Sequence, residues 1–278
     1  MKMKNKKLLI IEIAIMIIIV IIVVILGYIK VLKPYNIAVE NYNKVFKIIE
    51  EKNNELDNKI KKIHKLVDSE EKVIDENIIV TAKDVTKKAE ASKLIIDKKP
   101  VKTEKIVKET EKLSTFPDYT KILKELDDTY TAYDTSIKQY KQLINPEESF
   151  IMKRLQNIDE IINVMAVTED NDPNGKLNKT GGYTATVYFE SKNVNQNEVY
   201  GRNLIDKGTD AGGAIEVYLN EEDAKKREEY LAGFDGSILS SGSHKIIGTI
   251  LIRTSNKLNA TQQKQLEEKI INTLIELE

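Results

Sequence analysis

Residues Leu8–Ile29 form an apolar run that contains a single charged side chain, Glu12. As a helix that rises about 1.5 Å per residue, this run is roughly 33 Å long, enough to cross a bilayer core of about 30 Å. Glu12 lies close to the basic end of the run, where its carboxylate can reach the interface. The run therefore predicts a transmembrane helix over residues 8–29, because a core helix of a soluble domain is rarely so long and so apolar.

The charges on either side of the run predict its orientation. Four lysines stand among the first seven residues, whereas Lys30 and Lys33 follow the run. The positive-inside tendency makes residues 1–7 a cytoplasmic tail and places residues 34–278 outside the cell. A cleaved signal peptide is the competing interpretation, but the run exceeds a typical signal core and no small-x-small cleavage site follows it. We therefore expect a retained single-pass anchor in the cell membrane.

Composition excludes several classes of function. The chain has 43 basic and 44 acidic residues, so no strong overall field attracts nucleic acid, and no basic patch with interleaved aromatic residues occurs. Cysteine is absent, which excludes disulfides, thiol nucleophiles and cysteine-ligated metals.

Residues 34–145 have the pattern of a helical stalk. Apolar residues recur at three- and four-residue spacing over Tyr35–Val67 and again, at coiled-coil spacing, over Pro117–Ile144. Two shorter helices are expected between them, over Thr81–Asp97 and Val101–Leu113. We expect an antiparallel hairpin or a slender three-helix bundle, all-α and coiled-coil-like, through which two copies of the chain could associate.

Residues 146–278 have the pattern of an α+β domain. Helices are expected over Glu147–Ile162, over Glu198–Asp206 and after Asn220, and Thr261 is expected to cap or open a final helix. The strands are expected over Asn163–Val167, Tyr183–Glu190, Ala214–Leu219 and Lys245–Arg253. This order predicts a four-stranded antiparallel or mixed sheet with helices on one face.

Local signals define one helix of this domain most clearly. Asn220 is suited to cap its first turn, with Asp223 three residues on. Arg227 interrupts the apolar face of the same helix. We expect it to pair with a carboxylate such as Glu216 at the sheet edge, and a ligand-facing role is the alternative.

The loop Thr168–Tyr183 is the sharpest candidate for chemistry. Asp170, Asp172 and Asn174, followed by Gly175, reproduce the opening of a calcium loop, in which oxygen ligands alternate before a sharp turn. The pattern then departs from an EF-hand, because Gly181 stands where a bidentate glutamate belongs and strands flank the loop. Two interpretations stay open: a tight turn in which Asp and Asn side chains cap backbone amides, or a calcium site. In the second, a remote carboxylate would complete the site, with Glu190, Asp206 and Asp210 as candidates.

Ser243 and His244 do not make a convincing catalytic pair. A hydrolase would need the two side chains to converge, whereas adjacent residues that enter a strand point to opposite faces. The sequence contains no other convincing catalytic set.

Three separated blocks carry a resemblance to a known group of proteins. They read TEDNDPNGKLNKTGGYTATVYF, GTDAGGAIEVY and SGSHKIIGTILIRTS, and they fall in order within residues 148–278. This region resembles a functionally uncharacterised C-terminal domain of Gram-positive membrane-anchored surface proteins, in which a transmembrane segment and a helical spacer commonly precede the domain. The resemblance implies surface display and brings no catalytic residues.

These observations predict a membrane-anchored surface protein that binds a protein or envelope ligand without catalysing a reaction. Two alternatives stay open. One is a cell-wall or extracellular enzyme, or an accessory domain of one, that uses the carboxylates near Asp170. The other is an envelope sensor or assembly factor.

Overall fold

The computed structural model describes residues 2–237, 240 and 242–277, with side chains from residue 9 onward. The chain folds into two compact units: Met1–Ser69 with Asn77–Thr131, and Glu70–Glu76 with Ala132–Glu278. The division falls inside α5 (Thr120–Gln142) and not at the predicted boundary between residues 145 and 146. The reason lies in the core of the second unit, which buries Leu143 completely and also packs against Ile74.

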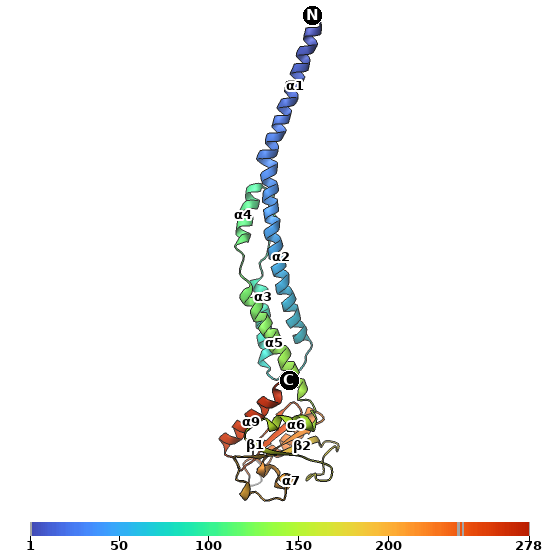
Figure 1. The fold of residues 1–278 in the computed structure, drawn as a ribbon, viewed down its shortest axis with the longest axis vertical. Coiled ribbons are helices and arrows are strands. Elements are labelled where there is room, and N and C mark those ends of the chain that lie inside the picture. The colour runs from blue at the N-terminus through green and yellow to red at the C-terminus, as the bar shows by residue number, and fades with distance from the viewer. Residues whose placement is uncertain (1, 238–239, 241, 278) are drawn as a thin grey trace. The chain divides into compact units, whose positions relative to one another are not determined.

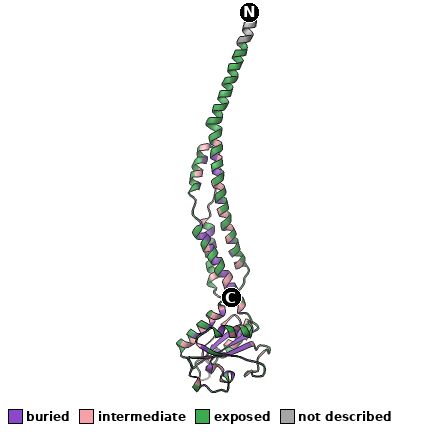
Figure 2. Ribbon diagram, viewed as in Figure 1, coloured by how far each residue is buried: buried purple, intermediate pink, exposed green. Residues whose placement is uncertain are grey.

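The first unit begins with a continuous helical segment. It comprises α1 (Lys2–Gly27), a π-helical turn (Tyr28–Leu32) and α2 (Lys33–Asp68). Residues 9–34 are exposed throughout (Figure 2). Within the described residues, this is the one helix long and apolar enough to span a membrane.

The predicted stripe on α2 is buried within the chain itself. It packs against α3 (Asn77–Ser92) and α4 (Thr103–Ser114), which fill the predicted intervening segments (Figure 1). The buried stripe residues are Ala38, Tyr42, Ile49, Leu56, Ile60 and Ile63. Hydrogen bonds also connect α2 to later segments of the unit. The side chain of Asn53 donates to the carbonyl of Leu94 and accepts from the phenol of Tyr119. These six residues of α2 are thus covered by other segments of the same unit.

The second unit is built on a five-stranded antiparallel sheet in the order β1-β2-β3-β5-β4. The first three strands follow the predicted ones closely. The strands are β1 (Ile161–Ala166), β2 (Tyr183–Ser191), β3 (Gly212–Tyr218), β4 (His244–Ile247) and β5 (Ile250–Thr254). The helices are α6 (Glu148–Gln156), α7 (Leu204–Lys207), α8 (Glu221–Ala232) and α9 (Ala260–Ile275), with short 3-10 turns at Gln196–Glu198 and Gly208–Ala211.

Helices cover both faces of the sheet, so the predicted single helical layer is wrong. Alternate residues of a strand face opposite sides. On β3, Ile215 and Val217 join the core formed with α6 and α9. The neighbouring Tyr218 instead packs with Ala224 of α8. When a strand is buried on both faces, its sequence is a continuous apolar run. Such a run does not indicate which face of the sheet each helix covers.

The predicted strand Lys245–Arg253 is two strands joined by a tight turn, which is why the sheet has five strands and not four. Gly248 has φ +59° and reverses the chain between the paired Ile247 and Ile250. Thr249 of this turn donates its backbone N–H to the carbonyl of Leu143 at 3.2 Å and its hydroxyl to the same oxygen at 3.1 Å. The flanking residues are apolar on both sides of the turn, which hides it in the sequence.

The helix caps confirm one prediction and correct another. Asn220 accepts the backbone N–H of Asp223 at 2.9 Å, as the sequence predicts. The last helix is capped by Asn259 and not by Thr261, because Asn259 and Gln262 form a reciprocal capping box.

We expect Gly248→Ala to destabilise the second unit. A side chain at φ +59° is strained, and its Cβ would lie 2.9 Å from the carbonyl oxygen of Leu143. The free energy of unfolding of the full chain should fall by about 2–4 kcal/mol in a denaturant titration. Gly175→Ala is the matched control, because Gly175 has the same φ with open space around it. It should cost about 1 kcal/mol, and equal losses would contradict a role for the contact with Leu143.

Candidate functional site

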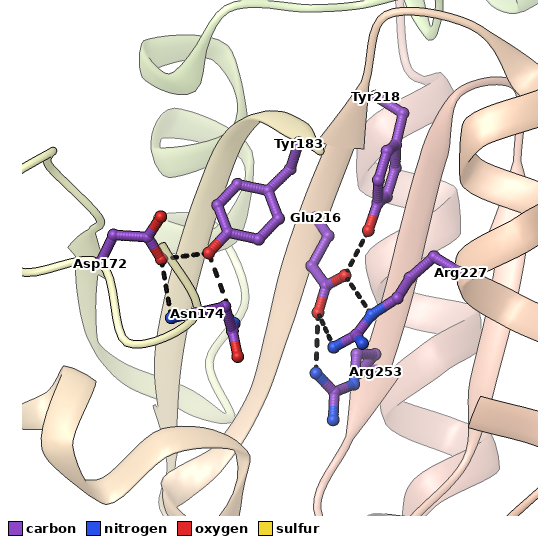
Figure 3. A network of polar contacts seen from close by, with 7 residues as sticks. All are labelled: Asp172, Asn174, Tyr183, Glu216, Tyr218, Arg227 and Arg253. Carbon is purple, nitrogen blue, oxygen red and sulfur yellow. Dashed lines mark hydrogen bonds and ion pairs between the residues drawn. The ribbon is translucent and has the colours of Figure 1, made fainter. Parts of the chain in front are cut away.

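Asp172 is the centre of the loop that precedes β2. Its Oδ1 accepts the backbone N–H of Asn174 at 3.0 Å, and its Oδ2 accepts those of Lys176 and Leu177 at 2.6 and 2.7 Å. The phenol of Tyr183 also donates to Oδ1 (Figure 3). Both carboxylate oxygens are therefore used within the loop, which favours the tight-turn interpretation of this sequence.

These contacts change the pKa values of Asp172 and Tyr183 in opposite directions. Burial alone would raise the pKa of Asp172, but the donors from Tyr183 and from the amides of Leu177, Asn174 and Lys176 outweigh it and lower the pKa. For Tyr183, burial and the hydrogen bond to Asp172 raise the pKa. The pair is thus an ionised carboxylate held by a neutral phenol.

The other predicted calcium ligands are placed differently. Asn174 lies in the same network, where its side-chain amide donates to the phenol oxygen of Tyr183 at 3.4 Å. Asp170 is exposed and lies outside this network. Two of the proposed remote carboxylates are engaged elsewhere, Glu190 with Lys207 and Asp206 with Arg202. Across the described residues, no group of three or more His, Cys, Asp or Glu side chains could hold a metal ion, so calcium binding stays a prediction.

Gly182 lets the loop fold back tightly on itself. A Cβ at this position would lie 2.0 Å from the carbonyl oxygen of Lys176. The backbone N–H of Gly182 donates to Lys179 at 2.8 Å, and that of Asn178 donates to Tyr183 at 2.8 Å. The loop therefore has a defined shape and returns directly into β2.

A second polar network lies on the same face of the sheet, beneath α8. The Glu216 side chain is completely buried on the central strand β3. Arg227 of α8 donates to it from Nε at 3.0 Å and from Nη2 at 3.3 Å, which confirms the expected pairing but places it at the sheet centre and not at its edge. Arg253 of β5 and the phenol of Tyr218 each donate to it at 2.7 Å (Figure 3).

The two guanidinium groups keep Glu216 ionised. Burial would raise the pKa of this carboxyl, but the positive charges of Arg253 and Arg227 and the hydrogen bonds from Arg227 and Tyr218 lower it. In the same network, burial and the Glu216 charge raise the pKa of Tyr218. Glu216 is therefore a buried anion that ties α8 and β5 to the middle of the sheet.

A pocket of about 440 Å³ lies between the loop and α8. Tyr183 and Tyr218 are directly paired across β2 and β3 and form its floor. Lys176 and the glycines at 181 and 182 line it from the loop. Its volume is within the range of small-molecule sites, about 300–1,000 Å³.

From α8, the pocket is lined by Asp223, Lys226, Arg227 and Tyr230. The guanidinium of Arg227 lies 5.4 Å from the centre of the Tyr230 ring, and that ring packs edge-on against Phe234. Lys226 is exposed and pairs with Glu222 at 2.7 Å. The pocket therefore combines aromatic surface with basic side chains.

Ser243 and His244 diverge as predicted. The Ser243 hydroxyl lies 2.6 Å from that of Thr254 and 3.4 Å from the carboxylate of Glu267 on α9. His244 instead lies 3.3 Å from both Glu228 of α8 and Asp235. Since α8 and α9 cover opposite faces of the sheet, Ser243 and His244 do not form a nucleophile–base pair.

No family model, curated protein or solved structure matches this chain.

We expect Asp172→Ala to destabilise the loop, because three backbone donors and the phenol of Tyr183 lose their acceptor. The free energy of unfolding should fall by about 1–3 kcal/mol at pH 7. The stabilisation by Asp172 is present above an ordinary carboxyl pKa of about 3.9 and is lost as the pH falls through the lowered pKa of the folded state. The difference between wild type and variant should therefore shrink below about pH 4.

Asp170→Ala is the matched control, since it removes an exposed carboxylate from the same loop. It should change the free energy of unfolding by less than about 0.5 kcal/mol. An equal effect of both substitutions would contradict the assigned role of Asp172. A melting midpoint that rises with calcium in wild type but not in Asp170→Ala would instead support the calcium interpretation.

Proposed function

We propose that this chain is a single-pass membrane protein of the cell surface whose second unit binds a small ligand without chemical turnover. The observation that carries the proposal is the pocket between the Asp172 loop and α8. Each of its walls is held by its own hydrogen-bond network, so the cavity is formed before a ligand arrives. A preformed pocket with an aromatic floor is typical of small-molecule binding.

The sequence supports an outward orientation of the second unit. The lysines before residue 8 outnumber those directly after the apolar run. By the positive-inside tendency, the amino terminus is cytoplasmic and both units after residue 33 are extracellular. The resemblance of residues 148–278 to domains of Gram-positive surface proteins agrees with this location.

The acidic groups near the pocket support binding over catalysis. Asp172 and Glu216 are ionised and saturated by structural donors, whereas a general acid or base needs a free lone pair or a transferable proton near the substrate. An enzyme that uses the exposed Asp170 is the alternative, and it would require a partner group supplied by the substrate or by a metal. An envelope sensor or assembly factor would use the same pocket as its input.

Protease treatment of intact cells tests the orientation. We expect external protease to digest a tag attached to the carboxy terminus, because the proposed topology exposes everything after residue 33. A tag attached before Lys2 should survive until the cells are lysed. Survival of the carboxy-terminal tag on intact cells would overturn the proposed topology.

Retention of small molecules tests the pocket. The full chain in detergent micelles is incubated with a cell-envelope extract, washed and denatured, and the released compounds are identified by mass spectrometry. Lys226→Trp places an indole at the exposed rim of the pocket and should abolish retention of any compound bound there. Lys225→Trp is the matched control, because its neighbouring exposed position does not line the pocket. Equal retention by both variants, or none by wild type, would contradict the proposal.

A further inference from the structure

We propose that the pocket recognises an oxyanion, a carboxylate or a phosphate, attached to an aromatic or apolar body. This inference rests on the proposed ligand-binding function and specifies the chemical class of the ligand. The acidic group would lie among Lys176, Lys226 and Arg227, and the body would lie against the exposed ring of Tyr230.

The charge of the lining favours an anion. Lys176, Lys226 and Arg227 contribute three positive charges to the pocket, whereas Asp223 is the one acidic residue among its lining residues. Asp223 lies at the start of α8, where its carboxylate accepts the side-chain amide of Asn220 at 2.9 Å and lies 3.8 Å from the amine of Lys226. An anion that enters the pocket therefore meets a lining with a net positive charge, which attracts it.

The two lysines are available to a ligand at little cost. Lys176 is exposed, and its amine has no ion-pair partner among the residues that the structure describes. Lys226 pairs with Glu222 at 2.7 Å on the surface of α8, with both side chains more than 60% exposed, and it also lies 3.8 Å from Asp223. Exposed pairs of this kind contribute little to stability, so Lys226 can exchange Glu222 for a ligand oxygen.

Arg227 supplies the fixed element of the site. Its Nε and Nη2 hold the buried Glu216, so one edge of the guanidinium is committed. A guanidinium has five donors, and the edge that includes Nη1 makes no hydrogen bond that involves the described residues. Because Glu216 and the Tyr230 ring fix the side chain, this second edge is preorganised for the two oxygens of a carboxylate or a phosphate.

Tyr230 selects the body of the ligand. The phenol oxygens of Tyr183 and Tyr218 are engaged with Asp172 and Glu216, and the two residues are only 3% and 2% exposed, so the accessible aromatic surface of the pocket comes from Tyr230. Tyr230 at the rim is 58% exposed, which is a large uncovered area for an aromatic residue. A ring or a short apolar chain stacked there gains both burial and aromatic contact.

Calorimetric titration of the full chain in detergent micelles tests this inference with four probes. Benzoate and phenyl phosphate carry the two acidic groups on a common ring, benzamide is the neutral counterpart of benzoate, and inorganic phosphate lacks the ring. We expect at least one of the two aromatic anions to bind at least about tenfold more tightly than both benzamide and inorganic phosphate. The comparison of benzoate with phenyl phosphate distinguishes a carboxylate ligand from a phosphate ligand.

Charge-removing variants locate the site. Lys176→Ala combined with Lys226→Ala should weaken binding of the preferred anion about tenfold, since two charge-assisted contacts are lost. Lys225→Ala removes an identical charge from the adjacent position on α8 outside the pocket and should leave the affinity within about twofold. All of these lysines are exposed, and unchanged melting midpoints of the variants would establish that they fold.

Three results would overturn the inference: no heat with either aromatic anion, equal affinity for benzoate and benzamide, or equal weakening by the Lys225 and the double variants. These results are distinguishable from failure of the proposed function. If wild type retains a neutral compound and Lys226→Trp does not, the proposed ligand-binding function stands and the inference of oxyanion recognition is refuted.

Discussion

The buried carboxylate of Glu216 is the interaction on which the second unit depends. An ion at the centre of a sheet is stable only if surrounding groups replace its lost hydration. Here Arg227, Arg253 and Tyr218 do so from α8, β5 and β3 itself. Because the carboxylate cannot remain unpaired without a large cost, its two hydrogen bonds from Arg227 hold α8 over the middle of the sheet. One wall of the pocket follows from this requirement.

The other wall depends on a second carboxylate with a different role. Asp172 is half-buried and gathers the donors of its own loop, which the glycine at 182 lets return to β2. The two networks meet where Tyr183 and Tyr218 pair across β2 and β3. Each tyrosine donates its phenol hydroxyl to the carboxylate of its own network and lines the pocket from a nearly buried position. The cavity is thus a consequence of two independently satisfied acids that share one face of the sheet.

The sequence predicted the parts of this arrangement that depend on local pattern. The apolar amino-terminal helix, the stripe of α2, the cap at Asn220 and the partnership of Arg227 with Glu216 follow from periodicity, helix-start chemistry or the cost of an unpaired charge. Features set by tertiary contact were missed. The turn at Gly248 is hidden because apolar residues flank it, so Arg253 was not placed on the same face as Glu216. The sequence pattern shows Tyr183 only as a strand residue. Its hydrogen bond to Asp172 depends on how the loop closes, which residue spacing does not predict.

The division of the chain into units has a topological consequence. The sheet unit includes residues 70–76, which lie between α2 and α3 in the sequence. There the backbone N–H of Ile74 donates to the hydroxyl of Ser136, and Glu71 pairs with Lys141. The polypeptide therefore crosses between the two units three times, after residues 69, 76 and 131. If the chain crossed between the units only once, a single cut would separate one complete unit from the other. In this chain a single cut between residues 131 and 132 would leave residues 70–76 of the sheet unit on the fragment that carries the other unit.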